Sequence, residues 1–289
     1  MFWAFLLACV PAEDTDAPKT EDDSPVVAEL APLTIDSCPT IESGTIKMKY
    51  DWGTRKVKLI VPDAAPAHMP VLFAYHGIGD TPSNFANFMD FKELSNEHEM
   101  VIVVPEGDPN NLIEWGFMSG GEEDIAIYDD LRTCISEQLD VDLTRFYATG
   151  FSAGALWTTL LSTRRADTLA AAMVMSGGTG TIVDYETPAA PIPFLLMWGG
   201  TIDTYPIMVL EISFEETTLA FSEELRADEH FVVHCNHGKG HTVPWPAGPN
   251  AVEKWLIPHV SGGGDSPFAS DELDGFPDYC SIANSETVP

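Results

Sequence analysis

The sequence has few basic residues. Its 289 residues include 14 Lys and Arg against 45 Asp and Glu, which gives a formal net charge of −31 at pH 7. Phosphate backbones and anionic lipid surfaces repel such a chain, so we expect neither nucleic acid nor an anionic membrane surface as a partner. Five of the basic residues lie in the first predicted hairpin, where we interpret them as protection of an edge strand: Lys47, Lys49, Arg55, Lys56 and Lys58.

Long apolar runs are also absent. The run over residues 2–8 is far too short to span a bilayer. It resembles the end of a signal peptide, and Leu6-Leu7-Ala8-Cys9 resembles a bacterial lipobox, in which the cysteine carries the lipid. We therefore expect a signal or lipobox segment over 1–9 and a secreted protein anchored at the cell envelope through Cys9. An ordinary signal peptide or a misassigned start is the alternative. Residues 10–37 are predicted to form an acidic flexible tether.

Cysteine is scarce. Without Cys9 four cysteines remain, an even number that fits two disulfides in an exported protein: Cys38, Cys134, Cys235 and Cys280. Three pairings are possible. Cys134 is expected at the amino edge of the sheet and Cys235 at the opposite edge, which disfavours joining them. We prefer Cys38–Cys134 and Cys235–Cys280, with Cys38–Cys280 as the alternative for the tail. Residues 261–289 form a polar tail with little apolar content of its own.

Zinc-site spacing is missing as well. His234, Cys235, His237 and His241 lie close together in the sequence, but no second Cys/His pair accompanies them. We expect no metal and no cofactor.

The most informative positive feature is the pentapeptide Gly150-Phe151-Ser152-Ala153-Gly154, which joins an apolar strand to a helix-forming segment. GxSxG in this setting is typical of a nucleophile elbow, where two glycines leave room for a tight turn and the serine hydroxyl is exposed above the sheet. A glycine-rich turn with a solvated serine is the alternative interpretation.

A serine nucleophile needs a histidine base and a carboxylate that orients it. Asp203 follows the apolar run 193–198, and His241 lies on a glycine-flanked loop after the last predicted strand. This order of Ser, Asp and His is that of the α/β hydrolases. We predict Ser152 as the nucleophile, His241 as the base and Asp203 as the orienting acid. Asp228 and Glu211 are alternative acids, although they fit a helix surface better.

The oxyanion site is predicted upstream. The strand expected over 70–75 opens into His76-Gly77-Ile78-Gly79-Asp80, an HGxG-type loop. We predict the backbone N–H groups of Ile78 and Ala153 as the oxyanion hole, with Gly77 as the fallback donor. Loss of one such donor costs roughly 3 kcal/mol of transition-state stabilisation. His76 is expected to make structural hydrogen bonds rather than to act as the base.

Strands and helices alternate along the chain, which predicts an α/β fold: an α/β-hydrolase catalytic domain over 38–260 with a mostly parallel sheet and helices on both faces. The predicted strands are 45–50, 56–61, 71–75, 101–105, the strand that leads into the elbow, 172–176, 194–198 and 231–235. The predicted helices are 84–98, 123–139, the helix that follows the elbow to about 165, 214–228 and 251–260. The segment between 178 and 193 is too short for a helical lid, so the site should be open.

The substrate-binding residues are predicted from loop position. Trp115 and Tyr205 lie on segments that leave the carboxyl ends of strands, so both should border the opening above Ser152. Trp157, five residues after the nucleophile, is expected in the core.

From Cys38 to Pro258 the chain resembles the secreted esterases grouped with polyhydroxybutyrate depolymerases and feruloyl esterases, particularly lipoprotein-like members. The resemblance depends on His76-Gly77, on the pentapeptide around Ser152, on Trp198-Gly199-Gly200 before Asp203, and on Gly240-His241. It implies the same three roles for Ser152, Asp203 and His241.

The chain departs from that group at a few positions. Cys and Gln are common where Ile78 and Asp80 stand, and Gly and Trp where Lys239 and Val243 stand. We therefore expect a secreted, monomeric serine ester hydrolase that forms an acyl-enzyme on acyl or aryl, feruloyl-like esters. The alternatives are a polyester depolymerase, a peptidase of the same fold, and a non-catalytic binding protein of this fold.

Overall fold

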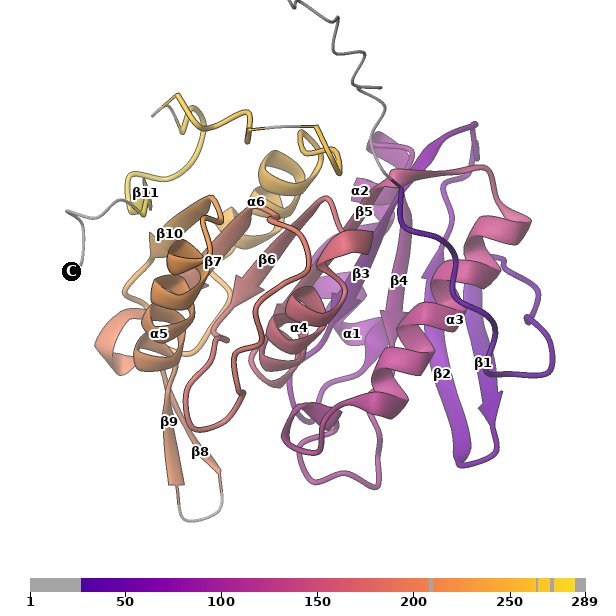
Figure 1. Ribbon diagram of the computed structural model, residues 1–289, viewed down its shortest axis with the longest axis horizontal. Helices are drawn as coiled ribbons and strands as arrows, with labels where there is room; N and C mark the ends of the chain where they lie inside the picture. Colours follow the sequence, from indigo (N-terminus) through magenta and orange to yellow (C-terminus); the bar gives the residue numbers. More distant parts are fainter. Residues whose placement is uncertain (1–26, 208–209, 264, 271–272, 284–289) are drawn as a thin grey trace, which may run out of the picture.

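The computed structural model describes residues 27–289 except 208–209, 264, 271–272 and 284–289 (Figure 1). The predicted lipobox segment and Cys9 lie outside the described residues. No helix in the described part of the chain is long and apolar enough to cross a membrane.

A nine-stranded sheet forms the centre of the molecule, in the order β1-β2-β4-β3-β5-β6-β7-β10-β11. The six strands from β4 to β10 in this order are parallel, whereas β1, β2 and β11 are antiparallel to their neighbours. The strands are β1 (Gly44–Tyr50), β2 (Gly53–Ile60), β3 (Met69–Tyr75), β4 (Val101–Pro105), β5 (Val141–Phe151), β6 (Ala171–Met175), β7 (Phe194–Trp198), β10 (Val232–Asn236) and β11 (Cys280–Ile282).

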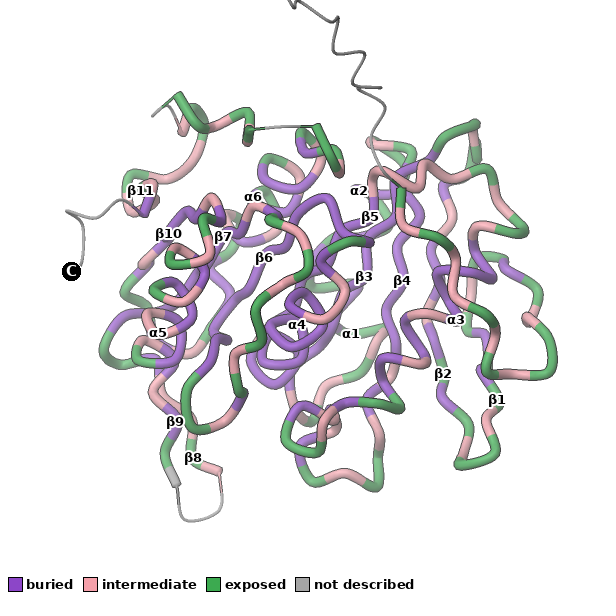
Figure 2. The backbone as a smooth tube through the Cα atoms, in the orientation of Figure 1, coloured by how far each residue is buried: buried purple, intermediate pink, exposed green. Residues whose placement is uncertain are grey.

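Helices cover both faces of the sheet, as predicted. One core joins the sheet to α3 (Glu122–Gln138), α4 (Ala153–Arg164) and α5 (Phe214–Ala227). The other joins it to α1 (Pro82–Phe88), α2 (Phe91–Glu97) and α6 (Ala247–Leu256). Central strands are apolar and buried along their whole length because both of their faces are covered. Figure 2 shows that the central strands are buried, whereas the segment after α6 is largely exposed or partly buried.

The single helix predicted over 84–98 is wrong. It is two helices, α1 and α2, because Asp90 adopts a left-handed backbone with φ of 52° and turns the chain between them. The side-chain oxygen of Thr81 caps α1 by accepting a hydrogen bond from the amide of Asn84 at 3.2 Å. The turn brings Phe85 and Phe91 together edge to face, with ring centroids 5.8 Å apart.

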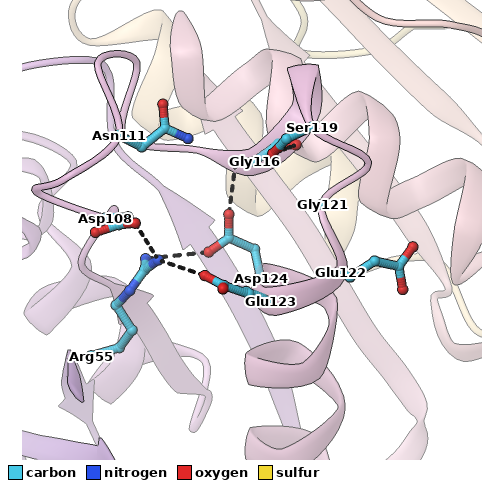
Figure 3. Close-up of a pocket in the computed structure, with 9 residues that line it drawn as sticks. All are labelled: Arg55, Asp108, Asn111, Gly116, Ser119, Gly121, Glu122, Glu123 and Asp124. Carbon is cyan, nitrogen blue, oxygen red and sulfur yellow. Dashed lines mark hydrogen bonds and ion pairs between the residues drawn. The ribbon is translucent and has the colours of Figure 1, made fainter. Parts of the chain in front are cut away.

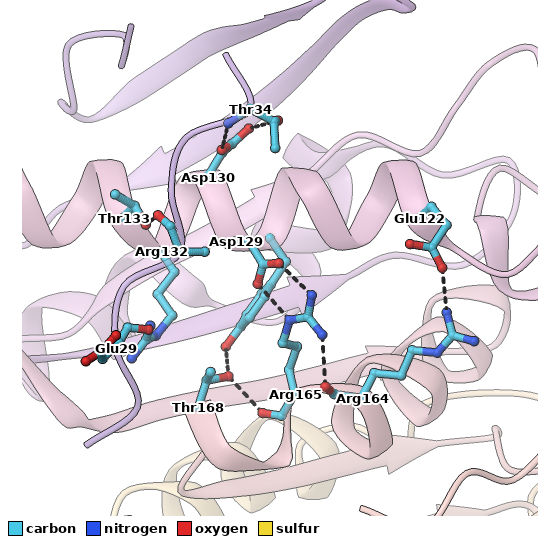
Figure 4. Close-up of polar contacts among 12 residues, drawn as sticks. Glu29, Thr34, Glu122, Asp129, Asp130, Arg132, Thr133, Arg164, Arg165 and Thr168 are labelled. Atoms are coloured by element: carbon cyan, nitrogen blue, oxygen red, sulfur yellow. Dashed lines mark hydrogen bonds and ion pairs between the residues drawn. The ribbon is translucent and has the colours of Figure 1, made fainter. Parts of the chain in front are cut away.

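Residues 27–37, which composition placed in the flexible tether, instead lie along α3 (Figure 4). The Arg132 guanidinium donates to the carbonyl oxygens of Ala28 and Glu29 at 2.9 and 3.0 Å. The Thr34 amide donates to Asp130 at 2.8 Å. These bonds satisfy buried charges on α3 with backbone groups of the incoming segment, so the ordered domain begins earlier than predicted.

Both preferred disulfides are present. Cys38–Cys134 ties the amino-terminal segment to α3, and Cys235–Cys280 ties the polar tail to β10. Cys280 is opposite Cys235 in the antiparallel register of β10 and β11. A short hairpin that the sequence analysis missed, β8 (Thr204–Ile207) with β9 (Leu210–Ser213), projects from the carboxyl edge of the sheet between β7 and α5 (Figure 1).

Candidate active site

The turn between β5 and α4 has the geometry of a nucleophile elbow. Ser152 has φ of 57° and ψ of −122°, a strained conformation for a residue with a side chain. A Cβ on Gly150 would lie 2.3 Å from the carbonyl oxygen of Gly154, and one on Gly154 would lie 2.2 Å from that of Tyr75. Real Cβ atoms do not approach so closely, so both glycines are required for this turn.

The structure brings together the three residues predicted as a triad. His241 Nε2 lies 2.8 Å from Ser152 Oγ, and His241 Nδ1 lies 2.7 Å from Asp203 Oδ1. The alternative acids are elsewhere: Asp228 accepts a hydrogen bond from the Tyr185 hydroxyl at 2.7 Å, and Glu211 lies exposed in β9. This arrangement can move a proton from the hydroxyl to the imidazole.

Asp203 is fully buried at the base of the loop after β7. Its Oδ2 accepts hydrogen bonds from the Ser176 hydroxyl at 2.7 Å and from the Gly199 amide at 2.8 Å. Burial alone would raise the pKa of Asp203, but the hydrogen bonds from His241, Gly199 and Ser176 outweigh it and hold the pKa below its usual value. The carboxylate is therefore ionised and fixed in orientation.

The predicted oxyanion donors belong to two segments that adjoin the nucleophile. Ala153 is the first residue of α4, and a Cβ on Gly77 would lie 3.4 Å from the Ser152 Cβ, so the loop passes directly beside the serine. Within the described residues, neither the Ile78 amide nor the Ala153 amide makes a hydrogen bond. Their role as oxyanion donors stays a prediction, which the start of α4 favours at Ala153 because a helix N-terminus attracts negative charge.

His76 holds the oxyanion loop, as expected, and does not contact the triad. Its Nε2 accepts a hydrogen bond from the Gly107 amide at 3.3 Å. Glu114 Oε2 accepts from the Gly79 amide at 3.0 Å, and the Trp115 indole donates to the His76 carbonyl oxygen at 3.0 Å. Three contacts from the segment after β4 thus fix the loop that carries Ile78.

Trp115 is not at the opening, contrary to the sequence-based expectation. It is 1% exposed and packs against Tyr75 and Trp157 with centroids 5.3 and 6.4 Å away. Its ring lies in the core because its indole N–H finds an acceptor beneath the oxyanion loop. Trp157 is fully buried, as expected. Tyr205 is partly exposed, and its ring lies 5.4 Å from that of His241.

Sequence reasoning missed other residues near the site. The rings of Phe151 and Phe214 stack on the His241 imidazole. Two exposed aromatic side chains, Phe88 and Trp245, also contact each other, with ring centroids 6.0 Å apart. Phe88 follows the loop that carries Ile78, and Trp245 follows the loop that carries His241. No periodic pattern in the sequence marks these four aromatic residues. Their contacts and the exposure of their side chains are seen only in the folded chain.

A polar pocket of about 320 Å³ lies under the segment after β4 (Figure 3). Arg55 is buried there and lies 3.3 Å from Asp124 and 3.4 Å from Asp108, while the Gly116 amide donates to Asp124 at 2.7 Å. Burial raises the pKa of Asp124 to about 6, against the opposing effects of Arg55 and Gly116. The pairing anchors the segment that carries Glu114. Among the described residues, no group of three His, Cys, Asp or Glu side chains could hold a metal ion.

Comparisons with known proteins agree with this picture. No family model matches the chain. It is 27% identical over 125 residues to poly(3-hydroxyalkanoate) depolymerase C of Paucimonas lemoignei, covering 41% of this chain and 30% of the relative. It is 24% identical over 170 residues to feruloyl esterase D of Neurospora crassa (53% and 56% covered). It is 28% identical over 168 residues to a probable feruloyl esterase C of Aspergillus oryzae (56% and 58% covered). The matches thus span less than two thirds of these relatives.

Solved structures share the fold. The native crystal structure of a protein called sOPH superposes with a TM-score of 0.70 at 18% identity, over 86% of this chain and 96% of that one. A ferulic acid esterase superposes with a TM-score of 0.57 at 17% identity, over 74% and 95%.

Proposed function

Because this chain is an α/β hydrolase similar to the polyhydroxyalkanoate depolymerase and feruloyl esterase group, we propose that it is a serine ester hydrolase that forms an acyl-enzyme. The observation that carries the proposal is the continuous hydrogen-bonded chain from Ser152 Oγ through His241 to Asp203, at 2.8 and 2.7 Å. The low-identity relatives support ester chemistry, and these two distances support the roles proposed for the three residues.

The proposed reaction uses these groups in two half-reactions. His241 Nε2 takes the Ser152 proton while Oγ attacks the ester carbonyl carbon, and the oxyanion that forms accepts hydrogen bonds from the amides of Ile78 and Ala153. The intermediate collapses as His241 gives the proton to the leaving alcohol, which leaves an acyl group on Ser152. Water, deprotonated by His241, repeats the sequence and releases the acid. Asp203 keeps the proton on Nδ1 throughout.

The proposed substrates are acyl or aryl esters with an apolar group. Ile202, next to the acid, is 67% exposed, and Trp245, four residues after the base, is 53% exposed. We propose that these side chains, with Phe88 and with Tyr205 beside His241, form an apolar rim around the site, which would suit an aryl ring or an alkyl chain. Hydrolysis of a polyester is the second candidate, favoured by the same exposed rim and by the depolymerase relative.

Export is part of the proposal. Two disulfides tie the described domain, and disulfides persist mainly in oxidising compartments outside the cytosol. Attachment through a lipid on Cys9 is tested by labelling cells with a radioactive fatty acid and comparing the native chain with Cys9→Ser; a native chain without label would contradict it.

Ser152→Ala tests the function. We expect ester hydrolysis to fall by orders of magnitude with little change in thermal unfolding, because the hydroxyl bonds to His241 and not to a core group. Ser119→Ala, an exposed serine elsewhere on the surface, is the matched control. Substantial turnover by Ser152→Ala, or an organophosphonate adduct on a different serine, would refute the assignment. A panel of p-nitrophenyl esters beside methyl ferulate and a polyhydroxybutyrate suspension separates the substrate classes.

A further inference from the structure

The His241 imidazole lies between two phenyl rings. The Phe214 ring is nearly parallel to it, with an interplanar angle of 12° and centroids 4.6 Å apart. The Phe151 ring stacks at 27° and 4.9 Å. Phe214 belongs to the core under α3, α4 and α5, whereas Phe151 packs against the core on the other face of the sheet. The two rings therefore approach the imidazole from opposite sides.

The β8–β9 hairpin places one of these rings. The Phe214 amide donates to the Asp203 carbonyl oxygen at 2.9 Å, and Thr204 pairs with Ser213 at the base of the hairpin. The two ends of the segment from Asp203 to Phe214 are thus hydrogen-bonded to each other. As a result the acid, the stacked ring and Tyr205, whose ring is 5.4 Å from His241, are all held by one local structure.

Hydrogen bonds alone leave the imidazole some freedom. The bonds from Nδ1 to Asp203 and from Nε2 to Ser152 fix the two nitrogens, but the ring can still tilt about the line that joins them. A flat ring on each side limits that tilt and prevents the side chain from swinging out of line. When His241 takes the serine proton it becomes a cation, and the faces of aromatic rings attract cations.

We propose that Phe214 and Phe151 are positioning residues that hold the His241 imidazole in line with Ser152 and stabilise its protonated form during attack. The inference rests on the proposed function, since it assigns work to the proposed base. It predicts an effect on the chemical step rather than on substrate binding, because neither ring is required to touch the substrate for this role.

Phe214→Leu is the test, with Phe221→Leu as the matched control. Both phenylalanines lie on α5 and are buried, but Phe221 packs against Phe194 and Tyr185 instead of His241. Both variants should lose similar thermal stability. Only Phe214→Leu should lower kcat, by about 10- to 100-fold, with KM within about two-fold of the native value. Phe214→Tyr keeps the flat ring and should recover most of kcat.

The outcomes separate the two proposals. Equal kcat in Phe214→Leu and Phe221→Leu, while the native enzyme is active and Ser152→Ala is not, would overturn the positioning role alone. An inactive native enzyme, or an active Ser152→Ala, would overturn the proposed function. If Phe214→Leu does not fold, Phe151→Leu replaces it, because Phe151 is only partly buried. Unchanged kcat in that variant would refute the inference, and a loss of kcat at constant KM would support it.

Discussion

Replacing Asp203 with Asn tests which histidine tautomer the site needs. The carboxylate accepts three hydrogen bonds: one at Oδ1 from His241 Nδ1, and two at Oδ2 from Ser176 and Gly199. Asn has a single side-chain oxygen, and the Gly199 amide can only donate. That oxygen should therefore occupy the Oδ2 position, which turns the NH₂ group toward His241. Nδ1 must then accept, so the imidazole proton moves to Nε2 and the base loses the lone pair that faces Ser152.

The magnitude follows from this change of tautomer. The equivalent substitution in a serine protease lowers kcat by about 10,000-fold, which corresponds to roughly 5 kcal/mol of activation free energy. The fold should survive, because Asn has the same shape and keeps the bonds at the Oδ2 position. We expect a loss of about 1–2 kcal/mol in the free energy of unfolding, from weaker hydrogen bonds to a neutral group.

The assay is steady-state hydrolysis of p-nitrophenyl butyrate, with active enzyme counted by organophosphonate titration and folding checked by thermal unfolding. Asp228→Asn is the control, since that carboxylate accepts its hydrogen bond from Tyr185 and not from His241. If Asp203→Asn kept kcat within tenfold of the native enzyme, or if Asp228→Asn lost as much, Asp203 would not be the orienting acid.

Three further predictions concern stability. Trp115→Ala should lower the free energy of unfolding, measured in urea, by about 3–5 kcal/mol, because it truncates a core side chain. A selective rise in KM for aryl esters without that loss would instead show that Trp115 contacts the substrate. Gly154→Ala should yield little folded protein by near-UV circular dichroism, because its Cβ would lie 2.2 Å from the Tyr75 carbonyl oxygen; a stable, active variant would contradict the elbow geometry. Burial lowers the pKa of His234 and of His259 to about 4. Since the unfolded chain binds more protons between about pH 6.5 and 4, each should remove up to about 3 kcal/mol of stability as pH falls through that window. Urea unfolding of His259→Gln should show a correspondingly shallower loss, and an unchanged profile would show that His259 is solvated.

The sequence was sufficient wherever a local signal and the chain order determine position. Continuous apolar runs predicted the buried strands, and Ser152, Asp203 and His241 were found because each follows the carboxyl end of such a strand. Parallel strands bring those ends to one edge, so three residues far apart in sequence meet. The same reasoning about opposite edges disfavoured a disulfide between Cys134 and Cys235, and the preferred pairing of Cys38 with Cys134 is present.

The sequence was insufficient where tertiary contacts choose the conformation. Trp115 lies in an irregular segment whose direction depends on Gly107 and Glu114, so loop position could not tell an inward ring from an outward one. The break between α1 and α2 depends on a single left-handed residue, Asp90, within an unbroken helical pattern. Phe214 begins an ordinary amphipathic helix, and its contact with His241 appears only once the β8–β9 hairpin has closed.

The tail that follows α6 also protects the sheet from other chains. Without β11, the apolar strand β10 would present a row of unpaired backbone groups at the border of the sheet, and such a border recruits strands from neighbouring molecules. The bond from Cys235 to Cys280 holds this cover in place, and β11 itself is only 3 residues long, which leaves little for another chain to pair with. We therefore expect a reducing environment to expose this border of the sheet and to promote aggregation.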